Sequence, residues 1–213
     1  MFDARHCMHT RRANLSRQKG PLMSDVSVQE AAPSVNPLHV AAYAGLLVLM
    51  VFVIRSGDRF WLNFMHVMSG VLWTGIDLFM GFFVGPALRS APFEARRAVT
   101  MRLVPRTLFL MPTLAIITGT TGWYHAQQLG FLDVDWPQYG WVLAALIIIT
   151  ILTVQGLGLL LPTNVRVYLE LRKPEPDKAR IGQLMKLYIY FVGFQGVMQI
   201  AMILVMAKFV TGL

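Results

Sequence analysis

The chain has 213 residues, of which 55% are hydrophobic and 14% are charged, with a formal net charge of +8 at pH 7 and a mean hydropathy of +0.54. This composition predicts an all-α polytopic membrane protein that forms one membrane domain. The positive charge does not indicate nucleic-acid binding, because the cations lie in short segments beside apolar spans. The single cysteine, Cys7, excludes an internal disulfide and a cysteine-ligated cluster.

The N-terminal segment, residues 1–37, is polar and basic, and no apolar stretch of signal-peptide length follows its arginines. We predict that it forms a disordered cytoplasmic tail. Within it, Met23 opens the stretch MSDVSVQEAAPSV, which has the composition of an ordinary protein start. We therefore expect Met23 to be the initiator.

Five apolar segments follow, and a helix of about 20 mostly apolar residues suffices to cross the hydrocarbon core of a bilayer. Their approximate bounds are 38–54, 60–88, 104–124, 139–161 and 187–210. We expect residues 38–213 to form one transmembrane domain with five transmembrane helices: a four-helix bundle of the last four spans plus one N-terminal helix. The longer connecting segments are predicted to be loops: 89–106, 125–138 and 164–186.

Lysine and arginine are distributed unevenly among the segments outside the spans. The tail and the segments 89–106 and 164–186 hold sixteen of the nineteen cations, whereas 125–138 holds none and carries two aspartates. An arrangement of five spans places the three basic segments on the same side. Because basic loops stay on the cytoplasmic side, we predict a protein of the cytoplasmic (inner) membrane with its N-terminus in the cytoplasm and its C-terminus outside.

The second span gathers its polar residues on one helical face at about 100° per residue. Turning such a face toward lipid costs a few kcal/mol for each charged group. We therefore predict that this polar stripe faces one enclosed site, with His66 and Asp77 as its ionisable members below the membrane surface. The members of the stripe are Arg59, Asn63, His66, Ser69, Gly70, Trp73 and Asp77.

His66 lies about 10 Å below the start of the second span, at 1.5 Å per residue. Its small neighbours Ser69 and Gly70 leave room for a macrocycle, Trp73 shares its face, and imidazole is a common axial ligand of haem iron. We predict that His66 binds a haem, which would be of the non-covalent b type because the chain has no CxxCH motif. The alternative is a buried histidine that is hydrogen-bonded between helices.

His125 follows the third span on the same side of the membrane as His66. It is a candidate second axial ligand if the segment 125–138 turns inward. The alternative is an interfacial histidine in the aromatic belt of the membrane. Arg55 and Arg59, at the outer surface, are candidates for pairing with haem propionates.

Asp77 lies eleven residues beyond His66, about 16 Å deeper in the membrane. An acid in apolar surroundings is a candidate for proton transfer, and a hydrogen bond to a Thr or Gln of another span is the equally favoured alternative. Gln195 and Gln199, one turn apart on the fifth span, either line the same cavity as Asp77 or bind neighbouring backbones.

Three stretches resemble the membrane-embedded, haem-binding protoporphyrinogen oxidase family. FMHVMSGVLWTGIDLFMGFFVGPALR (64–89) has that family's early histidine, a Trp–small–Gly element and a basic exit; MRLVPRTLFLMPTLAIITGTTGWY (101–124) matches its next helix, and LVMAKFV (204–210) its last. The helix ending in GPALR is also similar to the membrane domain of copper-resistance D proteins. The resemblance covers about residues 59–210.

The resemblance implies that His66 is a haem ligand. The family's lysine near the start of its third helix has no counterpart here, since the equivalent stretch, YGWVLAALIIIT (139–150), contains no lysine. The resemblance therefore implies haem binding and membership of a wider superfamily more directly than it implies the oxidase reaction.

The sequence leaves functions of different classes open. The first is a b-type haem protein that acts in electron transfer or porphyrinogen oxidation; the second is a non-catalytic subunit or assembly factor of a larger respiratory or photosynthetic complex. A metal-handling permease of the copper-resistance type is a third. The expected partners are the lipid bilayer and either other membrane subunits or copies of the same chain, with no nucleic acid.

Overall fold

The computed structural model describes residues 37–212. The chain divides into two units, residues 1–34 and 35–213, and the described residues all belong to the second. The predictions of a disordered tail over residues 1–37 and of an initiator at Met23 lie outside the described residues, apart from Pro37.

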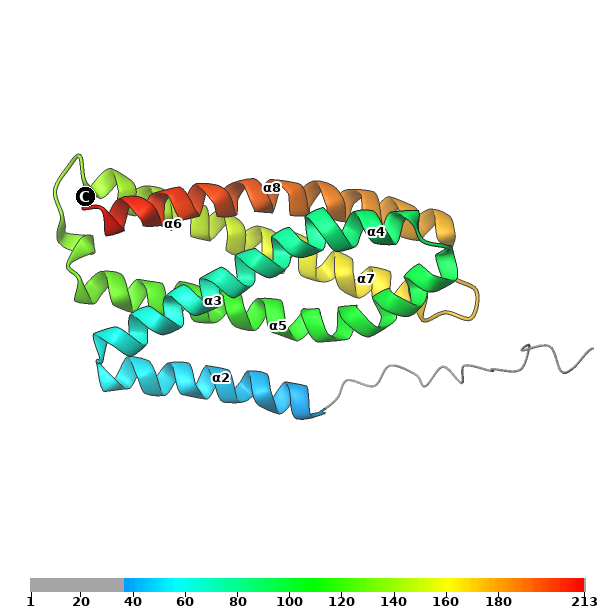
Figure 1. The fold of residues 1–213 in the computed structure, drawn as a ribbon, viewed down its shortest axis with the longest axis horizontal. Coiled ribbons are helices and arrows are strands. Elements are labelled where there is room, and N and C mark those ends of the chain that lie inside the picture. Colours follow the sequence, from blue (N-terminus) through cyan, green and yellow to red (C-terminus); the bar gives the residue numbers. More distant parts are fainter. Residues whose placement is uncertain (1–36, 213) are drawn as a thin grey trace, which may run out of the picture. The chain divides into compact units, whose positions relative to one another are not determined.

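Five helical segments are long and apolar enough to cross a membrane, which confirms the predicted all-α, five-span fold (Figure 1). Between residues 37 and 212 the structure contains no strand. The segments are α2 (Pro37–Ser56); α3 (Arg59–Phe79) with the turn η1 (Met80–Val84) and α4 (Gly85–Ser90); α5 (Phe93–Gln128); α6 (Tyr139–Gln155) with η3 (Gly156–Leu160) and α7 (Leu161–Leu171); and α8 (Lys178–Val210). A short 3₁₀ turn, η2 (Phe131–Asp133), lies between α5 and α6.

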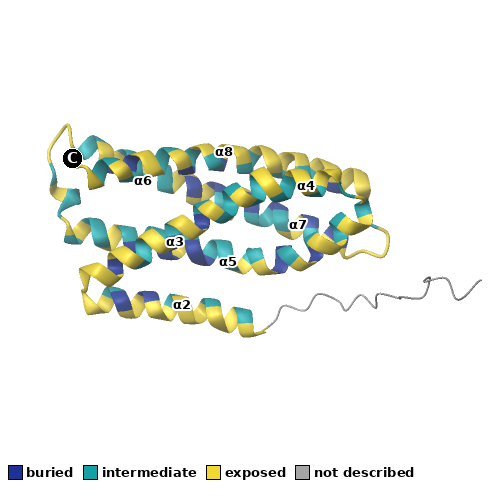
Figure 2. Ribbon diagram, in the orientation of Figure 1, coloured by how far each residue is buried: buried dark blue, intermediate teal, exposed yellow. Residues whose placement is uncertain are grey.

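The last four segments form the bundle and α2 lies beside it, as the sequence predicted. The α3 helix packs along α5, α6 packs along α8, and α2 contacts α5 and α3 (Figure 1). Only Met50 and Val53 of α2 are buried, so most of this helix remains exposed (Figure 2).

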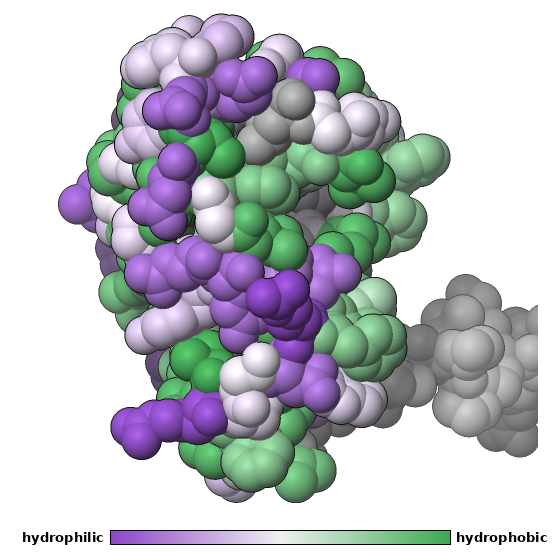
Figure 3. All heavy atoms as spheres, turned by 90° about the vertical axis from the view of Figure 1, so that its left-hand side faces the viewer, coloured by the Kyte–Doolittle hydropathy of each residue, from purple (hydrophilic) through white to green (hydrophobic). Residues whose placement is uncertain are grey.

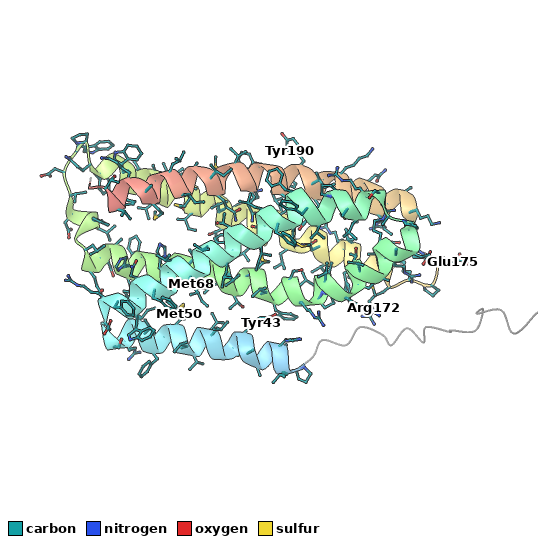
Figure 4. The ribbon with its side chains drawn as sticks, viewed as in Figure 1. Tyr43, Met50, Met68, Arg172, Glu175 and Tyr190 are labelled. Carbon is teal, nitrogen blue, oxygen red and sulfur yellow. The ribbon has the colours of Figure 1, made fainter. Side chains whose placement is uncertain are left out.

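The bundle has two ends of different character. One end contains the α2–α3 turn and the α5–α6 loop; it holds Arg59, His66 and His125, and we call it the histidine end. Polar side chains gather over this end face and apolar side chains border them (Figure 3). The other end contains the α4–α5 turn and the α7–α8 loop, with Arg172 and Glu175 (Figure 4), and we call it the basic end.

The interior of the bundle contains polar side chains, whereas large apolar side chains lie on the outside, as expected when the outer surface faces lipid. Eight polar or charged side chains are buried among the described residues: Ser69, Thr113, Thr121, Gln155, Thr163, Glu170, Gln195 and Gln199. Large apolar side chains such as Phe82, Val154 and Leu204 are exposed on the outside. Tyr190, 76% exposed, points away from the bundle (Figure 4).

The basic segments predicted as loops are mostly helical. Residues 93–106 belong to α5, residues 161–171 form α7, and α8 begins at Lys178, so only short connections remain. Hydropathy marks where lipid ends along a helix, but not where the backbone stops making helical hydrogen bonds. The 36 residues of α5 span about 54 Å, well beyond the hydrocarbon core of about 30 Å.

The π-helical turns η1 and η3 interrupt two of the spans toward the basic end. Each is closed by a backbone bond five residues back, from Gly85 to Met80 and from Leu161 to Gly156. In each case the next helix has a proline, Pro86 or Pro162, at its second residue. Because proline has no N–H, it removes one α-helical bond and favours this local widening.

Candidate functional site

His66 is held between α3 and α5. Its Nδ1 lies 2.9 Å from the carbonyl oxygen of Thr118, and its ring lies against Gly122, where an added Cβ would come within 2.6 Å of Cε1. The hydroxyl of Thr118 donates to Ser69 Oγ at 2.8 Å, beside this contact. His66 is therefore a half-buried interhelical histidine with one fixed nitrogen, which leaves Nε2 for another partner.

His125 lies near His66. It lies on α5, seven residues beyond Thr118 and three beyond Gly122, so that all three share one face of the helix. His125 interacts electrostatically with His66 and with Arg59. The segment containing it is the last turn of α5 and not part of a loop, so no inward turn of the 125–138 segment is needed to bring the two histidines together.

Nδ1 of His125 is buried and has no hydrogen-bond partner within the described part of the chain. Buried polar atoms in proteins are normally hydrogen-bonded, so this unpaired imidazole nitrogen, on a residue that interacts electrostatically with a second histidine, is unusual. The two histidines together are the strongest candidate site at this end.

Arg55 and Arg59 flank the histidine end. Arg55 closes α2 and Arg59 opens α3, and both side chains are exposed. Gly57, with φ of 67°, and Asp58 make the tight turn between them, and Asp58 caps α3 by accepting from Phe60 and Trp61. The amide of Gln128 donates to the carbonyl of Gly57 at 3.2 Å, which ties the end of α5 to this turn.

The polar stripe of α3 is divided between different neighbours and does not enclose one site. Arg59 and Asn63 are exposed, while His66, Ser69 and Gly70 face α5 at Thr118 and Gly122. Trp73 is 5% exposed and packs with Leu114 and Leu152 in an apolar cluster. The prediction of a single enclosed site along the stripe is therefore wrong, because α3 meets different helices at different depths.

Asp77 is the centre of a second polar site. Its Oδ2 accepts hydrogen bonds from Gln195 Nε2 at 2.5 Å and from Gln199 Nε2 at 2.8 Å, and Trp73 contributes a further side-chain hydrogen bond. The predicted interhelical bond from Asp77 to a Gln of another span is therefore confirmed. The same bonds confirm that the two glutamines of α8 face Asp77 and do not bind neighbouring backbones.

A small cavity of about 60 Å³ lies next to Asp77, between α3, α5, α6, η3, α7 and α8. Its polar wall is formed by Asp77, Thr107, Thr153, Asn164, Tyr188 and Gln195. A second, more open groove of about 400 Å³ lies between α5 and α6 near Gly119, Trp123 and Leu157. Neither includes His66 or His125.

Sequence reasoning missed Thr118 and Gly122, which hold His66 in place. Thr118, Gly122 and His125 follow one another at intervals of four and three residues, which puts all three on one face of α5, and this spacing was a usable signal. Asn164 was also missed, because it lies beyond the fourth apolar segment and no local pattern relates it to Asp77.

A b-type haem can be tested against the residues present. His66 keeps Nε2 available while a carbonyl oxygen holds Nδ1, which is the usual arrangement of a metal-ligating histidine. His125 offers a second buried imidazole nitrogen. These are nitrogens of the kind that a haem iron would take, and His66 and His125 are the residues that would hold it, although neither of the two cavities described above includes them.

Comparison of the chain with protein-family models, with curated proteins and with solved structures finds no match in any of the three.

Proposed function

We propose that the protein is a b-type haem protein of the cytoplasmic membrane, with His66 as an axial ligand and His125 as the second. The observation that carries the proposal is the pair of histidines on adjacent helices, one held by the Thr118 carbonyl and the other with an unpaired buried nitrogen. Haem in such a setting supplies one-electron transfer, which is the chemistry we assign to the protein.

The protein's own residues have distinct parts in this proposal. Thr118 fixes the tautomer and orientation of His66 by accepting from Nδ1, so that Nε2 presents its lone pair. Gly122 allows the imidazole to approach α5 closely. Arg55 and Arg59, exposed at the histidine end, are available to pair with propionate carboxylates.

The sequence resemblance to the protoporphyrinogen oxidase and copper-resistance D superfamily supports the same role for His66. Porphyrinogen oxidation is a narrower form of the proposal. The missing lysine in 139–150 favours electron transfer over that reaction.

The proposed orientation places the histidine end outside and the basic end in the cytoplasm. It rests on the excess of Lys and Arg in the α4–α5 and α7–α8 regions and on their absence from 125–138.

The absorption spectrum of the purified protein tests the proposal. We expect a Soret band in the wild type, its loss in His66→Ala, and its retention in Asp77→Asn, which changes a different polar site on the same helix. A colourless wild-type protein purified from cells supplied with haem precursor would contradict the proposal.

A second function, a non-catalytic subunit of a larger membrane complex, is favoured by one observation. The polar residues of α3 are used in helix contacts, since His66 packs on Gly122 and Asp77 bonds to α8. A colourless protein that co-purifies with other membrane subunits in fixed ratio would support this second function.

A further inference from the structure

We propose that Asp77 is a proton-binding group reached by water from the basic end of the bundle only, through the cavity beside it. This site is separate from the two histidines, and the proposal does not depend on haem binding. It rests on the cavity, on the buried glutamines and on the apolar cluster that closes the other direction.

The first observation is a pair of unpaired amide oxygens. Gln195 and Gln199 are 3% and 2% exposed, and both direct Nε2 to Asp77. Their Oε1 atoms are buried and have no hydrogen-bond partner among the residues described. Buried side-chain oxygens are rarely left unpaired, so these two are the acceptors that water or a protonated carboxyl group would use.

The second observation is the polar wall of the cavity. From Asp77 the lining continues through Thr107, Asn164 and Tyr188, which lie near the starts of α7 and α8 and in the basic half of α5. Leu108 also lines it, and its carbonyl lacks an α-helical partner because Pro112 has no N–H. The volume of about 60 Å³ accommodates about two water molecules.

The third observation is the closure toward the histidine end. Trp73 and Leu152 line the cavity, and together with Leu114, which does not line it, they form a cluster in which each side chain is 5% exposed or less. The partly buried residues packed on it are also apolar, including Leu110, Ile148 and Met198. Water therefore has a polar route to Asp77 from the basic end and an apolar barrier beyond it.

The surroundings suit a carboxyl group that changes its protonation. Donors from Gln195, Gln199 and Trp73 stabilise the carboxylate, whereas the apolar interior disfavours the charge. The titratable group that faces Asp77 is Tyr188 of α8, while α5 and α7 contribute the neutral Thr107 and Asn164. In uptake, a hydronium ion from the basic end gives its proton, through the water in the cavity, to a carboxylate oxygen of Asp77 and becomes water. In release, the protonated carboxyl group returns the proton to that water, which carries it away as hydronium.

Cysteine accessibility tests the water route. In a Cys7→Ser background, Asn164→Cys and Thr107→Cys are treated with a membrane-impermeant, charged methanethiosulfonate in vesicles of both orientations. We expect both to react from the side that also modifies Glu175→Cys, about tenfold or more faster than Leu114→Cys, which lies in the apolar cluster and does not line the cavity, because a thiol in apolar surroundings keeps its proton. Equal rates at residues 164, 107 and 114, or reaction only from the side of Gln127→Cys, would overturn the proposal.

Carbodiimide labelling of the intact wild-type protein tests whether Asp77 carries a proton. Its main result comes from the wild type and therefore does not depend on the folding of a variant. Dicyclohexylcarbodiimide modifies protonated carboxyl groups in apolar surroundings, so we expect a labelled peptide containing Asp77 in the wild type and none in Asp77→Asn. A carboxyl group that serves only as a permanently ionised hydrogen-bond acceptor would remain unmodified, and that result would also overturn the proposal.

Discussion

At the residue scale, Gly122 leaves less room for an added Cβ than any other described glycine, because the ring of His66 lies against it. Gly122→Ala would place a methyl group 2.6 Å from the His66 ring, so the imidazole must move away from Thr118. We expect a loss of about 1–3 kcal/mol in unfolding free energy, together with a lower haem content, measured by denaturant unfolding in detergent and by absorption.

The control for this substitution is Gly75→Ala on α3, where an added Cβ meets nothing within 4 Å. Alanine has the better helix propensity, so no destabilisation is expected there. If the two substitutions had equal effects, the tight packing of His66 on α5 would be refuted.

The bonds from Asp77 to α8 give a second prediction at the same scale. In a double-mutant cycle of Asp77→Asn and Gln199→Ala, we expect a coupling energy of about 0.5–1.5 kcal/mol, the range of interhelical hydrogen bonds in membranes. Steric-trap or detergent unfolding measures it. Additive effects would show that the 2.8 Å contact contributes nothing to the stability of the bundle.

Residue patterns predicted part of both sites. The helical face of the second span identified His66 and Asp77 as inward-facing, and residue spacing placed Gln195 and Gln199 together on α8. These patterns could not show that one part of the polar face of α3 contacts α5 and another part contacts α8, because this depends on how α3 crosses its neighbours. The partners Thr118 and Gly122 depend on the placement of α5 relative to α3, which hydropathy does not determine.

At the scale of the elements, the sequence predicted that each apolar span is a helix, but it did not predict where each helix begins and ends. The apolar segments all became helices, but α5, α7 and α8 continue through the basic residues. Polar side chains extend these helices outside the hydrocarbon: Asp177 caps α8 by accepting from Ala179 and Arg180, and Arg97 binds the end of α7.

Arg97 joins two helices at the basic end. Its Nε donates to the Leu171 carbonyl at 3.1 Å and an Nη donates to the Lys173 carbonyl at 3.2 Å, where the last carbonyls of α7 have no helical partner. We expect Arg97→Ala to lower the unfolding free energy by about 1 kcal/mol.

The matched control is Arg102→Ala, since Arg102 lies on the same helix, is exposed, and makes no interhelical hydrogen bond in the described chain. Thermal unfolding in detergent compares the two. A smaller loss for Arg97→Ala than for Arg102→Ala would contradict a capping role.

At the scale of the whole molecule, composition and hydropathy predicted a five-span, all-α membrane protein, and the structure has this fold. Because the helices run from one end of the bundle to the other, a membrane that they span has the histidine end and the basic end on opposite sides. The proposed orientation predicts that, in a Cys7→Ser background, an impermeant thiol reagent added outside labels Gln127→Cys but not Glu175→Cys. Labelling of Glu175→Cys alone would reverse the orientation.

The central claim is that His66 and His125 together hold one haem iron, and electron paramagnetic resonance of the oxidised, purified protein tests it most directly. Two imidazole ligands predict a low-spin ferric signal in the wild type. We expect His125→Ala to retain haem but convert the signal to high spin, and His66→Ala to lose the haem. A low-spin signal unchanged in His125→Ala would contradict the paired ligation, and a wild-type protein without any ferric haem signal would contradict the haem itself.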